Sequence, residues 1–96
     1  MIRQGDLMEI AELRVEINNI DNEIVKLLLQ RMEVATNIGL EKKKKGLPVF
    51  DAVRERERLN TISGMVENDV LKPHMENIYR CIMDETKLVE EKLMEA

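Results

Sequence analysis

Apolar residues recur at alternating intervals of three and four along the first half of this chain. They fall at Ile10, Leu13, Ile17, Ile20, Ile24, Leu27, Val34 and Ile38, which is the spacing of one face of an α-helix. The pattern predicts a helix over about residues 6–45 that begins with Asp6 as its N-cap. The helix is expected to end at Gly46 as its C-cap, with Pro48 two residues beyond.

Two shorter helices are expected after this one. The first spans about residues 51–66, with Asp51 as its N-cap. The second spans about residues 71–94 and carries Pro73 in its first turn. Its inward residues are predicted to be Leu71, Met75, Ile78, Ile82, Val89 and Leu93. The pattern therefore predicts an all-α fold with three helices, one of them very long, in a single domain over residues 1–96.

The length of the first helix bears on assembly. A helix of about 38 residues is about 57 Å long, and the two shorter helices together cannot cover it in a compact monomer. A second copy of the chain would cover the remaining apolar face. We therefore expect a homodimer in which the long helices pair in an antiparallel or interlocked manner.

The composition narrows the range of partners and settings. The net charge of −4 argues against a nucleic-acid partner, because phosphate binding favours an excess of Lys and Arg. No apolar run approaches the roughly 20 residues of a membrane span, so no membrane partner is expected. Cys81 is the only cysteine and His74 the only histidine, which excludes a disulfide framework and a zinc site and fits a cytoplasmic protein.

One position on the long apolar face carries a charge. Arg31 occupies the slot between Leu27 and Val34, and a buried cation without a partner is destabilising by several kcal/mol. Either a Glu from another helix pairs with it, or a bound anion does. Lys42 returns to nearly the same face about 16 Å farther along the axis.

The two shorter helices also direct polar residues toward the core. Glu55 continues the apolar line of the second helix, and Arg54 directly precedes it. On the third helix, Thr86 and Glu90 lie one turn apart beside the apolar line. A structural salt bridge readily explains one inward polar residue. Several inward polar residues at a similar height along the three helices indicate a pocket that they line.

Arg14 is related to this pocket only through a second chain. It lies about 25 Å along the helix from Arg31 and is rotated by roughly 100°, so the two cannot grip one small ligand from the same helix. Taken alone, Arg14 would be an ordinary surface charge. In an antiparallel dimer, however, Arg14 of one chain can approach Arg31 of the other.

Several cations that converge inside an acidic protein indicate a small ligand with more than one anionic group. The sequence contains no Ser–His–Asp set, no cysteine with a base, no phosphate loop and no metal-ligand cluster. An enzyme built this way would act through orientation and electrostatics rather than covalent steps.

The segments "LRVEINNIDNEIVKLLLQR" and "LPVFDAVRERERL", with Lys42 between them, resemble the all-helical (AroQ-type) chorismate mutase family. The resemblance extends from about Leu7 to Leu93. It implies an intertwined homodimer with two equivalent active sites and no cofactor or metal. It also implies the [3,3] rearrangement of chorismate to prephenate, on the route to Phe and Tyr.

The resemblance also implies roles for the cationic side chains. Arg31 would hold one substrate carboxylate, and Arg14 of the partner chain would hold the other or share in both. Arg54 would orient the carboxylate end of the substrate with help from Asp51. Lys42 would donate to the ether oxygen, where negative charge grows as the C–O bond breaks.

The remaining implied contacts include one departure from the family. Glu55 would bind the ring hydroxyl, and Thr86 stands where the family often has a small hydroxyl residue. Glu90 stands where bacterial members commonly have a glutamine that donates to the ether oxygen. Because an ionised carboxylate cannot donate, Glu90 predicts a turnover that declines as the pH rises from mildly acidic toward neutral.

Two other functions remain open. A lyase that converts isochorismate to salicylate and pyruvate would share the arginines and Lys42, although it has no use for Glu55 at a ring hydroxyl. A helical dimerisation or regulatory module would keep the fold without turnover. The set of inward cations argues against the module, since a scaffold gains nothing from them.

Overall fold

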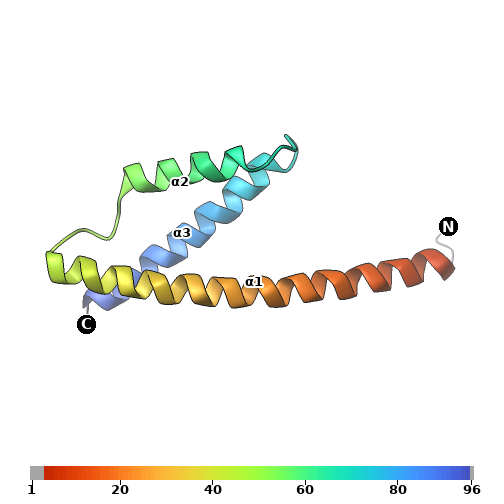
Figure 1. The fold of residues 1–96 in the computed structure, drawn as a ribbon, viewed down its shortest axis with the longest axis horizontal. Helices are drawn as coiled ribbons and strands as arrows, with labels where there is room; N and C mark the ends of the chain where they lie inside the picture. Colours follow the sequence, from red (N-terminus) through yellow and green to blue (C-terminus); the bar gives the residue numbers. More distant parts are fainter. Residues whose placement is uncertain (1–3, 96) are drawn as a thin grey trace. The chain divides into compact units, whose positions relative to one another are not determined.

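The chain folds into three helices, as the apolar pattern predicts. A computed structural model describes residues 4–95, with side chains described for 9–93 and 95. The helices are α1 (Gln4–Lys45), α2 (Ala52–Gly64) and α3 (Lys72–Glu95) (Figure 1). No strand occurs within residues 4–95, so the prediction of an all-α fold is confirmed.

Both ends of α1 can be compared with the predicted caps. The helix already includes Asp6, because it begins at Gln4, so the prediction of Asp6 as the N-cap is wrong. The C-cap prediction is confirmed. Gly46 has a φ of 67°, and its N–H donates to Lys43 O at 3.3 Å while Leu47 N–H donates to Lys42 O at 2.9 Å. This pair of bonds is the Schellman arrangement, which a left-handed glycine makes possible.

The cap of α2 also follows the prediction. Asp51 has an extended backbone, and its Oδ1 accepts a hydrogen bond from Arg54 N–H at 3.0 Å, which satisfies one of the free donors of the first turn. The helix ends at Gly64 rather than near Val66. There, Met65 N–H donates to Ile62 O at 3.0 Å, and this tighter bonding closes the last turn early.

The turn into α3 is organised by a single side chain. Asn68 Oδ1 accepts hydrogen bonds from Val70 N–H at 2.9 Å and from Leu71 N–H at 3.3 Å. An Asn side chain that bonds its own backbone two residues on stabilises a turn of this kind. The helix begins at Lys72, so Pro73 lies in its first turn as predicted.

The structure divides into two contact units, residues 1–33 and residues 34–96. In the first unit, the described part is one stretch of α1. Its apolar row is uncovered in the single chain, with exposures from 46% to 62% at Leu13, Ile17, Ile20, Ile24 and Leu27. Apolar side chains in such a row are normally buried against a partner surface.

The second unit contains a small core. Here α2 and α3 form a helical hairpin (Figure 1), and the end of α1 belongs to the same unit. Its buried apolar residues are Ala35, Ile62 and Met83. Two residues predicted to face inward, Leu71 and Ile78, are each 52% exposed in the single chain.

Candidate active site

Polar side chains gather in the second unit along the C-terminal half of α3. Thr86 and Glu90 are buried, with exposures of 9% and 6%. Their burial agrees with the inward position that the sequence predicts. Thr86 Oγ1 donates to Ile82 O at 2.7 Å, which satisfies the hydroxyl donor within its own helix.

Glu90 is paired with Lys42 from the end of α1. The Lys42 Nζ lies 3.3 Å from Glu90 Oε2, and it also donates to Val49 O at 2.9 Å. An ammonium has three N–H donors, so these two partners orient Lys42 and leave one donor for a ligand. The pair is largely removed from water, since the side-chain exposures of Lys42 and Glu90 are 22% and 8%.

A glycine lets α3 approach α1 at this point. Gly39 is buried, and a Cβ atom on it would lie 3.3 Å from both Glu90 Cγ and Leu93 Cδ1. Sequence reasoning missed this role of Gly39, although its position one turn before Lys42 was an available signal.

A second ion pair connects α2 to α3. Glu55 Oε1 lies 3.1 Å from Lys87 Nζ, which also lies 3.3 Å from Asp84 Oδ1. The ammonium stands 4.6 Å from the centre of the Phe50 ring, within the range of a cation–π contact. Burial by itself lowers the pKa of Lys87, but the hydrogen bonds to Glu55 and Asp84 outweigh it and raise that pKa above 10.5.

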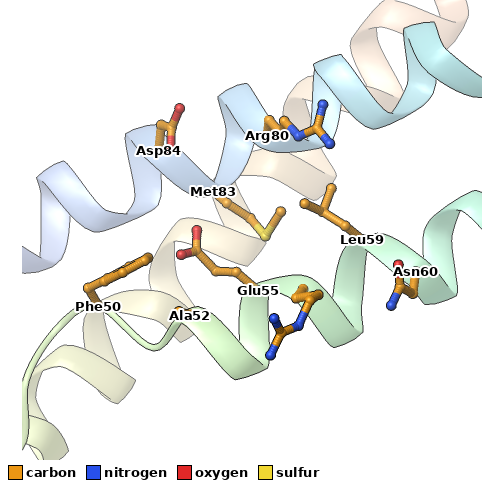
Figure 2. Close-up of a pocket in the computed structure, with 9 residues that line it drawn as sticks. Phe50, Ala52, Glu55, Leu59, Asn60, Arg80, Met83 and Asp84 are labelled. Atoms are coloured by element: carbon orange, nitrogen blue, oxygen red, sulfur yellow. The ribbon is translucent and has the colours of Figure 1, made fainter.

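Next to this ion pair, α2 and α3 line an open pocket of about 300 Å³. Figure 2 shows the Glu55 side chain extending from α2 toward α3, with Phe50 on one side and Met83 on the other. The pocket is lined by Phe50, Ala52, Glu55, Arg56, Leu59, Asn60, Arg80, Met83 and Asp84. Its lining combines apolar side chains with charged groups of both signs.

Arg54 and Asp51 lie at the start of α2, in the same unit. The Arg54 side chain is exposed, and none of the described carboxylates lies within ion-pair distance of it. Asp51 is exposed and caps the helix through the Arg54 N–H. The cap therefore gives Asp51 a structural task besides its predicted contact with the substrate.

The other two predicted arginines belong to the N-terminal unit. Arg14 is exposed, whereas Arg31 is half-buried and already interacts with its surroundings. The structure thus brings Lys42, Thr86 and Glu90 into one unit together with the start of α2, and it leaves Arg14 and Arg31 in a unit of their own. Lys87 was missed by sequence reasoning, although its place between Thr86 and Glu90 was a usable signal.

Known proteins resemble this chain over most of its length. It is 38% identical over 93 residues to the bifunctional chorismate mutase/prephenate dehydratase of Aquifex aeolicus, covering 88% of this chain and 25% of that protein. It is 31% identical over 87 residues to the protein of the same name from Buchnera aphidicola, covering 90% and 23%. The chain therefore spans about a quarter of the length of these bifunctional relatives.

A third relative is similar in size to this chain. The chorismate mutase of Methanocaldococcus jannaschii is 27% identical over 88 residues, covering 91% of this chain and 89% of that protein. The family model for chorismate mutase type II matches residues 13–91, which contain all the predicted site residues. On this match, the chain belongs to the type II chorismate mutase family.

Proposed function

We propose that this chain catalyses the rearrangement of chorismate to prephenate, in the biosynthesis of Phe and Tyr. In this step the ether C–O bond breaks while a C–C bond forms, and no proton or outside group is exchanged. The observation that carries the proposal is the family match, together with the oriented ammonium of Lys42. Such an ammonium suits an ether oxygen that gains negative charge in the transition state.

The other groups serve to hold a flexible dianion in its reactive shape. Arg31 and Arg54 bind the substrate carboxylates, since guanidinium forks match carboxylate geometry. Glu55 accepts a hydrogen bond from the ring hydroxyl beside the pocket on α2 and α3. Thr86 offers its hydroxyl oxygen to the substrate as an acceptor, since the hydroxyl proton is donated to Ile82 O. Asp51 caps α2 and so keeps Arg54 in place at the start of that helix. Holding the reacting ends together lowers the barrier without any covalent step.

We further propose that the active form is a homodimer in which Arg14 reaches the site of the partner chain. The uncovered apolar row of α1 supports this, because removing the exposed part of these side chains from water favours an assembly. The exposed and free Cys81 agrees with the cytoplasmic setting that the sequence predicts. No helix within residues 4–95 combines the length and the apolar character needed to cross a membrane.

Turnover is tested by following the loss of chorismate by ultraviolet absorbance and identifying the product. Prephenate supports the mutase, whereas salicylate and pyruvate from isochorismate would support the lyase. Arg31→Ala should lower kcat/KM by about 100-fold or more, since removing a transition-state contact of this kind typically has such an effect. Equal rates in the wild type and Arg31→Ala would leave only the non-catalytic module.

The shared site is tested by mixing two inactive variants. In a heterodimer of Arg14→Ala and Arg31→Ala, one site keeps both arginines and the other loses both. Random pairing of equal amounts should therefore restore about a quarter of the wild-type sites. Failure to recover activity after co-refolding, with heterodimers present, would contradict the contribution of Arg14 from the partner.

The carboxylate of Glu90 gives a test that is specific to this chain. As an anion it accepts from Lys42 but cannot donate to the ether oxygen. We expect Glu90→Gln, whose amide can donate, to turn over chorismate faster than the wild type at neutral pH. Equal rates for the two proteins would show that a donor at this position takes no part in the reaction.

A further inference from the structure

Lys87 is a half-buried cation that none of the proposed contacts uses. Its Nζ lies 3.1 Å from Oε1 and 3.3 Å from Oε2 of Glu55, so the ammonium faces both oxygens of that carboxylate. The two side chains are 26% and 22% exposed, which protects the pair from much of the screening by water. Among the residues described, this is the ion pair that joins α2 to α3.

Lys87 is itself held in place. Phe50 belongs to the segment that leads into α2, and the centre of its ring lies 4.6 Å from the Lys87 ammonium. Asp84, one turn earlier on α3, lies 3.3 Å away. The Asp84 side chain is 69% exposed, so this second ion pair contributes little energy. The aromatic ring and the two carboxylates together restrict the ammonium to one position.

Glu55 gains a fixed orientation from this arrangement. A free glutamate side chain has several rotamers, and ordering it on binding lowers affinity and rate. Two contacts from one ammonium select a rotamer before any ligand arrives. An ionised carboxylate has about four acceptor positions, so Glu55 keeps acceptor capacity beside the pocket that it lines.

We propose that Lys87 is a positioning residue that orients the Glu55 carboxylate to accept a hydrogen bond from the ring hydroxyl of the substrate. This inference rests on the proposed function and adds a residue to it. Lys87 acts through Glu55 and does not touch the reacting atoms. The raised pKa of Lys87, due to its hydrogen bonds with Glu55 and Asp84 against the opposing effect of burial, agrees with a permanently charged role at neutral pH.

The test compares kcat/KM for chorismate in a set of variants at about 0.15 M salt, where long-range steering is screened. Lys87→Met should lower kcat/KM about tenfold, which corresponds to the loss of one charge-assisted contact. Lys87→Arg should recover the rate to within about threefold of the wild type, because it can pair with both oxygens. On a Glu55→Ala background, Lys87→Met should change the rate by less than about twofold, since the group it orients is gone.

Lys44→Met is the matched control. Lys44 pairs with Glu41 at 3.4 Å on the exposed face of α1, so its loss should leave kcat/KM unchanged. Each variant is assayed at a temperature where circular dichroism shows it folded. Should Lys87→Met fail to fold, Lys87→Gln replaces it, because the amide can still donate one hydrogen bond to Glu55 and should give a smaller loss.

The outcomes separate this inference from the proposed function. A wild type without turnover would overturn both. A wild type that converts chorismate, with Lys87→Met within about twofold of it, would overturn the role of Lys87 alone. The role of Lys87 would also be overturned if Lys87→Met lowered kcat/KM by the same factor in the wild type and in Glu55→Ala. A lower melting temperature combined with an unchanged rate would reduce Lys87 to a structural ion pair.

Discussion

Gly39→Ala places a single methyl group between α1 and the side chains of Glu90 and Leu93 on α3. The new Cβ would lie 3.3 Å from Glu90 Cγ and 3.3 Å from Leu93 Cδ1, so these neighbours must move by a few tenths of an ångström. The end of the Leu93 side chain can rotate away. Glu90 has less freedom, because its carboxylate is held by Lys42 at 3.3 Å. The substitution therefore acts mainly on the Lys42–Glu90 pair.

The effect on stability is expected to be small because two contributions oppose each other. Replacing a mid-helix glycine by alanine stabilises the helix by about 1 kcal/mol, while forcing a methyl group into a packed site is destabilising by about 1–3 kcal/mol. We expect the free energy of unfolding to fall by about 0–2 kcal/mol. The kcat/KM for chorismate should fall about tenfold, or about 1.4 kcal/mol in the transition state, because the ammonium loses its alignment.

Urea unfolding and the chorismate assay measure the two effects on the same samples. Gly64→Ala is the control, since nothing lies within 4 Å of a Cβ at that position; it should leave kcat/KM unchanged and raise the free energy of unfolding by up to about 1 kcal/mol, because alanine has less conformational entropy to lose. If Gly39→Ala were more stable than the wild type and fully active, the close approach of α3 would have no part in shaping the site. Equal losses of activity in Gly39→Ala and Gly64→Ala would also contradict the role of Gly39 in shaping the site.

Three further substitutions test the caps and the second ion pair. Gly46→Ala should destabilise the protein by about 1–2 kcal/mol in urea unfolding, because its φ of 67° strains any residue with a Cβ, and no loss would argue against the Schellman cap. Asp51→Ala should lower the free energy of unfolding by about 1 kcal/mol while Asp51→Asn keeps the cap, and equal losses would show that charge rather than capping matters. The folded pKa of Lys87 lies above 10.5 because its hydrogen bonds to carboxylates outweigh its burial. Its stabilisation is therefore complete below pH 10.5 and is lost as the pH rises through the folded value, so the stability difference between the wild type and Lys87→Met should shrink from pH 9 to pH 12.

The helices could be predicted because their causes are local. Caps, glycines and prolines act within one turn, so Asp51, Gly46 and Pro73 indicate helix ends without knowledge of the rest of the fold. Errors arose at the ends too. Asp6 is a good capping residue, but α1 already passes through it, and α2 stops at Gly64 through tighter bonding in its last turn.

The candidate site could be predicted only as far as helical periodicity reaches. The pattern placed Thr86 and Glu90 on an inward face, and the structure buries both. It did not indicate that Glu90 meets Lys42, that Lys87 meets Glu55, or that Gly39 allows α3 to come close. Periodicity gives the direction of a side chain around its own axis. Which groups then meet depends on how helices pack, and only the tertiary structure decides the distances on which charge interactions depend.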